Sequence, residues 1–299
     1  MSQTSQRIAA VVVTRDRPEL FARLVLPGLH ELARGGFPVV VVDQGEDVET
    51  ERLVRAASGF VYLTSPPGLS RGRNMAVEAT STELLAFADD DVVLPSGWLQ
   101  LIVDAFDGHS DAGAVCGRGV TPAGRLLPGR DAGVYRFPAN PFGLGSGFNL
   151  AFRRAALEAA GPFDEELGAG SRFHAGEDTD LLYRVMRAGW SVVCSDEITV
   201  VHDDWRSGAA ELRLHFRYGF GAGAQTAAHL AAGDRAAFRI GLQEAWKHVR
   251  TFAMSVLTFR VRIARLQVAF LVGLVAGFAQ RRRLAGRARP GEDQAVIRR

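Results

Sequence analysis

The sequence contains little cysteine, with Cys116 and Cys194 as the two examples among 299 residues. They are far apart in the chain and lie in unrelated sequence contexts, without a C-x-x-C pair. This excludes the dense cysteine framework that staples small secreted domains and favours a reducing compartment. The polar residues 1–7 lead directly into an apolar stretch, without the basic and apolar segments of a signal peptide. We therefore expect a cytoplasmic protein.

The chain also lacks an uninterrupted apolar run of about 20 residues, the length that crosses a bilayer. Its longest apolar stretch, residues 266–279, has 14 residues and is interrupted only by Gln267. Arginines flank it on both sides: Arg260, Arg262, Arg265, Arg281, Arg282 and Arg283. Such a helix can lie among anionic headgroups, where each basic residue contributes about 1 kcal/mol. We expect peripheral docking on the inner face of the cell membrane. A core or dimer-forming helix and a tight span are the alternatives.

Lysine is nearly missing, since Lys247 is the only one among 35 basic residues, and we attribute this to a GC-rich genome. Acidic residues are missing between Ala245 and Gly291. Residues 245–299 hold 12 basic and two acidic residues, whereas residues 1–244 hold 23 basic and 31 acidic ones. An acidic body and a basic tail predict different partners. The tail has no interleaved lysines or stacking platforms, so we expect no nucleic-acid partner.

What the sequence does contain is an alternation of short β-branched runs and longer helical patterns, typical of an α/β fold with a parallel sheet. Strands are predicted at 8–14, 39–43, 60–63 and 84–88, and helices at 47–57 and 70–79. Residues 117–147 are rich in glycine and proline and predict long loops. Further strands are expected at 191–194 and 199–201, and helices at 178–188, 211–220 and 236–278. We place a first domain at 1–206, with a nucleotide-binding part at 1–91 and an acceptor part at 92–206, and a helical basic region at 207–299.

Carboxylates collect where the predicted strands end. Asp43 ends the second strand, and Asp89, Asp90 and Asp91 end the fourth. Ligands bind beyond the carboxyl ends of strands in open α/β sheets, so these residues should converge. Three neighbouring carboxylates repel one another unless a cation neutralises them, and Mg²⁺ or Mn²⁺ prefers such oxygen ligands. Alternation along an extended segment would turn Asp89 and Asp91 to one side and Asp90 to the other. An exposed acidic turn is the alternative.

Two further acidic or metal-binding candidates follow later in the chain. Glu177 and Asp178 stand between Gly176 and a helical pattern, where helix capping alone would also explain them. His202 ends a predicted strand at the same edge as the aspartates, and its imidazole is a good metal ligand. We therefore expect His202 to join a metal site.

The order of these motifs resembles that of the family 2 glycosyltransferases with the GT-A fold, over about residues 7–206. The resemblance rests on Val-Val-Val-Thr-Arg at 11–15, Val-Asp at 42–43, Gly-x-x-Arg-Gly-Arg-Asn at 68–74, Asp-Asp-Asp at 89–91, Gly-Ser-Gly-Phe-Asn at 145–149, Gly-Glu-Asp at 176–178 and His202. It implies a Rossmann-like, mostly parallel sheet flanked by helices. The tail would add a C-terminal helical region.

The resemblance also implies roles for individual residues. Base and ribose of the nucleotide would be held by Thr14, Arg15 and Asp43, and the nucleotide pocket would be lined by Arg73 and Asn74. Donor contacts would come from Asp89 and Asp90, with Gly147 and Asn149 near the donor sugar. Asp91, assisted by His202, would bind the metal that bridges the diphosphate. Asp178 would be the general base, and Glu177 would help to position the acceptor.

These roles imply a metal-dependent, inverting transfer of one sugar from a nucleotide-diphosphate sugar to a glycan or lipid-linked acceptor, in the synthesis of a cell-surface glycan, exopolysaccharide or glycolipid. Processive synthases of this family carry Gln-x-x-Arg-Trp after the base, whereas this chain reads His-Asp-Asp-Trp-Arg at 202–206. That departure favours single-sugar transfer. A metal-dependent nucleotidyltransferase and a non-catalytic membrane-associated scaffold of the same fold are the alternatives.

Overall fold

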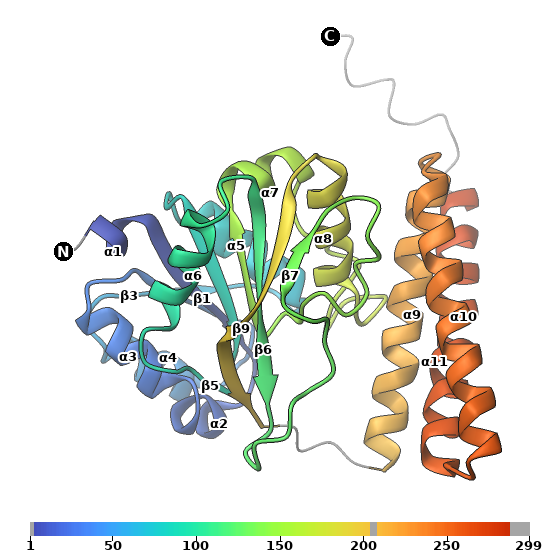
Figure 1. The fold of residues 1–299 in the computed structure, drawn as a ribbon. Helices are drawn as coiled ribbons and strands as arrows, with labels where there is room; N and C mark the ends of the chain where they lie inside the picture. Colours follow the sequence, from blue (N-terminus) through green and yellow to red (C-terminus); the bar gives the residue numbers. More distant parts are fainter. Residues whose placement is uncertain (1–2, 204–207, 288–299) are drawn as a thin grey trace, which may run out of the picture. The chain divides into compact units, whose positions relative to one another are not determined.

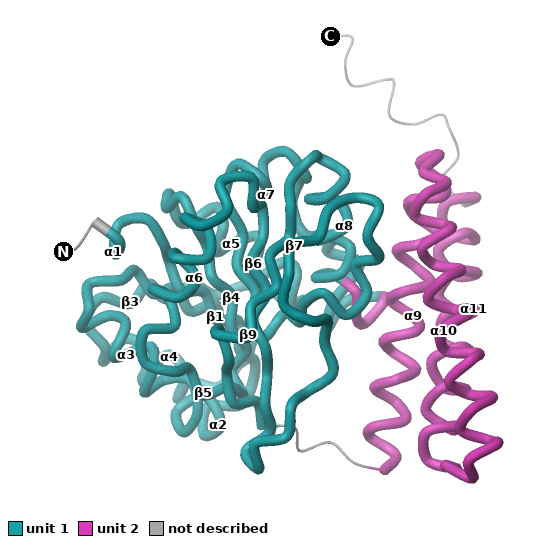
Figure 2. Tube along the Cα trace, in the orientation of Figure 1, with its two compact units in different colours: residues 1–172, 177–205 teal, residues 173–176, 206–299 magenta. Residues whose placement is uncertain are grey.

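A computed structural model describes residues 3–203 and 208–287, and these contain nine strands and eleven helices (Figure 1). They divide into two compact units (Figure 2). The first comprises residues 1–172 and 177–205, and the second comprises residues 173–176 and 206–299. The domain boundary expected after residue 206, and the departure from the synthase motif at 204–206, lie outside the described residues.

The first half of the sheet is parallel. Strands β1 (Ile8–Thr14), β2 (Val39–Asp43), β3 (Phe60–Thr64) and β4 (Leu84–Asp89) pair in the order β3-β2-β1-β4. Every residue of β2 is buried, which explains its run of β-branched side chains. The register pairs Thr14 with Asp43 and Val13 with Asp89. The polar ends of three strands therefore lie at one edge of the sheet.

Short helices connect these strands. Helices α2 (Pro18–Arg23) and α3 (Leu26–Arg34) follow β1, α4 (Val48–Arg55) follows β2, and α5 (Leu69–Glu78) follows β3, while α1 (Gln3–Arg7) precedes β1. The Asp47 side chain caps α4 by accepting from the backbone N–H of Glu49. Alternate residues of β1 enter two separate hydrophobic clusters, with Val12 in one and Val11 in the other. The sheet is therefore covered on both faces.

The second half of the sheet is mixed. Strand β8 (Asn149–Arg153) lies antiparallel between β4 and β6 (Ala112–Val120), and β9 (Ser191–His202) runs parallel to β6. Strands β5 (Val92–Val93) and β7 (Gly133–Tyr135) pair antiparallel with β9. Helices α6 (Trp98–Asp107), α7 (Arg154–Ala160) and α8 (Glu177–Arg187) complete the unit. Since β5 pairs Val92 with His202, the histidine lies directly beside the aspartate triplet.

Two sequence predictions about this half are corrected. The segments 191–194 and 199–201 form one continuous strand, β9, and the expected loop region 117–147 contains the end of β6 and all of β7. The two cysteines, which the sequence placed in unrelated contexts, are direct partners in the pairing of β6 with β9. Both are buried free thiols.

The helical unit contains α9 (Ala209–Ala231), α10 (Arg235–Leu257) and α11 (Val261–Arg287). The single helix expected at 236–278 is therefore two helices, because α10 ends before a turn at which Phe259 takes a φ of 55°. By length and composition, Val261–Gly286 is the one segment of the described residues that could cross a membrane. The apolar stretch identified in the sequence, residues 266–279, is shorter than this segment.

Helices α9 and α11 meet through glycines. Gly219 and Gly223 of α9 lie against the backbone of α11, and Gly273 and Gly277 of α11 lie against the backbone of α9. A Cβ at any of these positions would overlap a carbonyl oxygen of the facing helix. Paired small residues four positions apart allow this close approach, as in many membrane-helix pairs.

Candidate active site

A possible metal site lies at the rim of the sheet. Asp89, Asp91 and His202 each offer one ligand atom, and these atoms all lie within 4.8 Å of one another. His202 Nε2 lies 3.3 Å from Asp91 Oδ1. Two carboxylate oxygens and an imidazole nitrogen form a donor set that suits Mn²⁺ or Mg²⁺ with room for further ligands. The donor set therefore fits a divalent cation, and it adds Asp89 to the two metal ligands that the resemblance implied.

Arg17 is a part of this site that sequence reasoning missed. Its guanidinium lies 3.3 Å from Asp90 Oδ1 and 3.5 Å from Asp91 Oδ2, and the side chain is 41% exposed. Asp90 is buried and accepts from the Thr14 hydroxyl at 2.7 Å. Burial raises the pKa of Asp90 to about 6, although Arg17 and the Thr14 hydrogen bond oppose the shift. Asp90 and Thr14 thus form an internal pair behind the rim.

Asp43 lies at the neighbouring strand end. Its carboxylate accepts from the Gly45 N–H at 2.9 Å and from the Tyr62 hydroxyl at 3.0 Å. Burial and this hydrogen bond to Asp43 raise the pKa of Tyr62 to about 12, so the phenol stays a donor. Gln44 donates to the carbonyls of Pro66 and Gly68 and fixes the loop that faces this end of the strand. The nucleotide-binding candidate Asp43 is therefore held in one orientation.

Another candidate for binding the base lies in the turn after β1, and its side chain is more exposed than that of Asp43. Arg15 is about half exposed and pairs with Asp16 at 3.3 Å. Its long side chain is therefore available to a ligand.

Arg73 is buried and connects three motifs. Its guanidinium donates to Glu177 Oε1 at 3.0 Å, to Asp89 Oδ1 at 3.3 Å and to the Gly147 carbonyl at 3.1 Å. The cation also lies 5.9 Å and 5.6 Å from the ring centres of Phe87 and Phe163. With 2% of the side chain exposed, Arg73 holds the site together from behind and has almost no surface for a nucleotide.

Two asparagines expected to contact ligands are occupied by protein groups. The Asn74 amide donates to the Phe163 carbonyl and accepts from the Phe163 N–H. Asn149 is 1% exposed, accepts from Trp98 Nε1 and donates to the carbonyls of Arg118 and Ile198. In this structure Asn149 has no surface that could touch a donor sugar. Both residues therefore belong to the framework of the site.

The loop before β8 joins the metal site to the candidate base. The Gly147 N–H donates to Asp178 Oδ2 at 3.0 Å, and the Phe148 ring lies 4.7 Å from the His202 ring. A side chain at 147 would overlap the Arg73 guanidinium, which explains the glycine. Asp178 also accepts from the Thr179 N–H at 2.7 Å and is partly exposed at the first turn of α8. Consecutive loop residues thus contact the base and the metal ligand.

Glu177 differs from its neighbour because it is 6% exposed. Burial, and then the charge of Asp178, raise the pKa of Glu177 to about 7, while Arg73 opposes the shift. Its ion pair with Arg73 is an internal contact. The structure therefore gives Glu177 a place in the framework, whereas Asp178 presents the accessible carboxylate.

Comparison with known proteins shows which proteins this chain is similar to. Residues 10–133 match the family model described as glycosyl transferase family 2. Over these residues the chain is similar to the family 2 glycosyltransferases. It is similar to a pre-mycofactocin glycosyltransferase of Mycobacterium tuberculosis, with 30% identity over 194 residues that cover 59% of this chain and 40% of that protein. It is also similar to the O-antigen biosynthesis protein RfbC of Myxococcus xanthus, with 26% identity over 69% of this chain and 18% of that protein. The chain thus spans less than half the length of these relatives.

Similarity to solved structures shows that the chain has the GT-A fold. The mannosyltransferase PcManGT from Pyrobaculum calidifontis, in complex with GDP-Man and Mn²⁺, matches with a TM-score of 0.63 and 15% identity, covering 92% of this chain and 87% of that one. S. aureus TarS 1–349, in complex with UDP-GlcNAc, matches with a TM-score of 0.53 and 17% identity, covering 74% of this chain and 66% of that one.

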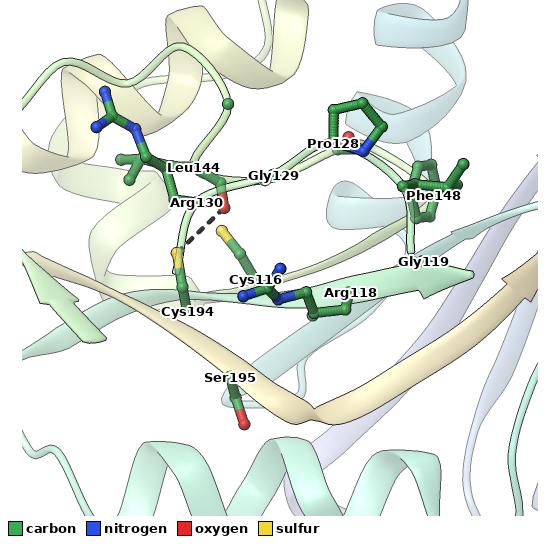
Figure 3. Close-up of a pocket in the computed structure, with 15 residues that line it drawn as sticks. Cys116, Arg118, Gly119, Pro128, Gly129, Arg130, Leu144, Phe148, Cys194 and Ser195 are labelled. Atoms are coloured by element: carbon green, nitrogen blue, oxygen red, sulfur yellow. Dashed lines mark hydrogen bonds between the residues drawn. The ribbon is translucent and has the colours of Figure 1, made fainter. Parts of the chain in front are cut away.

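A small cavity of about 20 Å³ lies behind the loop that precedes β8, between β6, β9 and residues 143–146 (Figure 3). Cys116 and Cys194 face each other there, and the Cys194 thiol donates to the Leu144 carbonyl at 3.1 Å. The hydrogen bond to Cys194 and burial both raise the pKa of Cys116. The two thiols therefore support the loop from below as hydrogen-bonding core residues.

Proposed function

We propose that this protein is a metal-dependent, inverting glycosyltransferase that moves one sugar from a nucleotide-diphosphate sugar to an acceptor hydroxyl. One observation carries the proposal. One of the three candidate metal ligands and Asp178 contact consecutive residues of one short loop, because Phe148 packs against His202 and Gly147 donates to Asp178. Sugar transfer requires the site of the leaving group and the base to lie within one substrate length of each other. Contact of both with this loop supports such an arrangement.

The rim residues would hold the leaving group. Asp89, Asp91 and His202 would bind Mg²⁺ or Mn²⁺, which acts as a Lewis acid and stabilises the charge that develops on the departing diphosphate. Arg17 adds a cation within 3.5 Å of the same carboxylates and, being 41% exposed, can turn toward a phosphate. Arg15 and Asp43 would receive the base and ribose at the adjacent strand ends, with the internal Thr14 behind them.

Asp178 would accept the proton of the attacking hydroxyl. One oxygen of its carboxylate accepts from the Gly147 N–H and the other from the Thr179 N–H, so the group is oriented before substrate binds. A positioned base of this kind contributes about 100- to 10,000-fold in rate. Attack on the face opposite the leaving group inverts the anomeric centre. Glu177 and Arg73 would support Asp178 and Asp89 from behind.

The substrates extend the proposal. The solved neighbours are in complex with GDP-Man and UDP-GlcNAc, which makes guanosine and uridine diphosphate sugars the first donors to examine. We expect single-sugar transfer to a glycan or lipid-linked acceptor, in cell-surface glycan, exopolysaccharide or glycolipid synthesis, by a cytoplasmic protein that associates peripherally with the membrane. The basic, partly apolar helical unit supports that last point.

A donor screen tests the proposal. Nucleotide sugars are incubated with the full chain, with and without Mn²⁺, and the release of nucleoside diphosphate is measured in wild type, Asp91→Asn and Asp178→Asn. We expect metal-dependent release from at least one donor, with strong loss in both variants. Pyrophosphate release from a nucleoside triphosphate would instead indicate a nucleotidyltransferase. No binding of any nucleotide sugar by calorimetry would indicate a scaffold.

A further inference from the structure

The helical unit carries an apolar groove of about 660 Å³ at the end where α10 turns into α11. Its wall comes from all three helices and includes Leu212, Phe252, Val256, Phe259, Val261 and Val268. Among the described residues that line it, Arg265 is the only charged one. None of the candidate active-site residues contributes to this wall, so the groove is a separate feature.

The turn beside the groove exposes large apolar side chains. Leu257 is 72% exposed, Phe259 89% and Val261 67%. The backbone holds them outward, because the N–H groups of Phe259 and Arg260 bond to the carbonyls of the last turn of α10. We call Leu257, Phe259 and Val261 the apolar tip. Such a contiguous apolar surface is unusual on a soluble protein and marks an interaction site.

The charge around the tip is of one sign. Arg250, Arg260 and Arg265 are exposed, and the sequence holds no acidic residue between Ala245 and Gly291. The nearby Arg262 is already neutralised by Glu211, its partner on α9. A partner must therefore be anionic at the arginines and apolar at the tip. An exposed apolar tip beside an apolar groove suits fluid hydrocarbon, which can surround the tip and fill the groove, better than it suits a rigid protein surface.

We propose that this end of the helical unit inserts into an anionic lipid bilayer, with a lipid chain in the groove and the arginines at the headgroup phosphates. The proposal deepens the membrane part of the proposed function and does not depend on the sugar chemistry. It also adds the apolar tip to the contact that the sequence had placed at residues 266–279. In that stretch Leu266 and Phe270 are buried, whereas Val268, Val272 and Val275 are exposed.

Vesicle flotation of the full chain tests this proposal. Vesicles of phosphatidylcholine alone are compared with vesicles that also contain phosphatidylglycerol. Leu257→Ser with Phe259→Ser removes the tip, and Arg260→Gln with Arg265→Gln removes two charges. Val48→Ser, at a 76% exposed valine of the other unit, is the apolar control, and Arg125→Gln, at an exposed arginine, is the charge control.

We expect wild type and both controls to float with the anionic vesicles. The tip variant should lose at least about tenfold in partition, from the apolar area no longer buried. The charge variant should lose about 30-fold, from two headgroup contacts. Equal partition of the tip variant and wild type would overturn the proposal, as would no flotation with either vesicle. Self-association that is seen by sedimentation and lost in the tip variant, without flotation, would assign the groove to a second copy instead. Release of nucleoside diphosphate by the same variants reports on the sugar chemistry separately.

Discussion

Replacing Arg73 by methionine removes the one cation shared by Glu177, Asp89 and the Gly147 carbonyl. Methionine keeps an apolar stem beside the aromatic rings, so the main loss is electrostatic. Breaking a buried ion pair costs about 3–5 kcal/mol, because the remaining carboxylate is left buried without its partner. We expect a loss of that size in the free energy of unfolding of the metal-free protein at pH 8.

The cost should depend on pH because Glu177 titrates. Its pKa in the folded protein is about 7, against 4.5 as the reference, so the folded state holds the proton more tightly than the unfolded state. This contribution to stability is fully present below pH 4.5 and is lost as the pH rises through 7. Without Arg73, which lowers the pKa, the loss extends to higher pH. At pH 5 Glu177 is neutral, and the variant should lose only about 1–2 kcal/mol, the cost of an unsatisfied neutral group.

Urea denaturation with chelator, followed by tryptophan fluorescence at pH 5 and pH 8, measures both values. Arg71→Met is a matched control, since Arg71 lies two residues away and forms a half-exposed pair with Glu165. Such surface pairs contribute about 0–1 kcal/mol. An equal cost for both variants, or a larger cost of Arg73→Met at pH 5 than at pH 8, would refute the account of Arg73.

Three further predictions concern the base, the nucleotide site and the helical unit. Asp178→Asn should lower kcat by about 100- to 10,000-fold and leave Mn²⁺ affinity unchanged. A loss of less than tenfold in the rate of nucleoside diphosphate release would contradict the role of Asp178 as the base. Tyr62→Phe removes one of the two hydrogen bonds that the Asp43 carboxylate accepts, so KM for the donor should rise about 2- to 10-fold with kcat unchanged. A pure kcat effect would argue against a binding role. Gly273→Leu should destabilise the helical unit by at least about 1–3 kcal/mol, because the new side chain meets the backbone of α9. Gly286→Ala, whose new methyl group enters open space, is the control. If limited proteolysis did not distinguish the two variants, close contact between α9 and α11 would be excluded.

The sequence was sufficient to predict the parallel half of the sheet. Strands such as β2 are buried on both faces. Burial on both faces favours an unbroken run of β-branched residues, which a helix of this length does not require. The strand ends then place Asp43 and Asp89 at one edge without further information. The separation of Asp90 from its neighbours also followed from alternation, since Asp90 bonds to Thr14 while Asp89 and Asp91 join His202.

Tertiary contacts between distant segments could not be predicted in this way. Arginine is usually a surface residue, and the burial of Arg73 depends on hydrogen-bond acceptors that lie 16, 74 and 104 residues away in the sequence. Arg17 reaches the aspartates from a turn in which the preceding residue, Asp16, takes a positive φ of 51°, and the sequence does not indicate that turn. Helix α6 was missed although its polar residues Gln100, Asp104 and Asp107 recur at helical spacing on one exposed face. The contact between Cys116 and Cys194 requires the register of β6 and β9, which neither local sequence encodes.

Calorimetric titration of Mn²⁺ into the full chain, with and without a nucleoside diphosphate, tests the central claim most directly. Wild type should bind one ion, more tightly when the diphosphate is present, because the cation would then be shared between the protein and the phosphates. Asp91→Asn and His202→Ala should each weaken binding by tenfold or more, while Asp203→Asn, next to the site, should not. Equal Mn²⁺ binding in all four proteins, or none in wild type under either condition, would contradict a metal site formed by Asp89, Asp91 and His202.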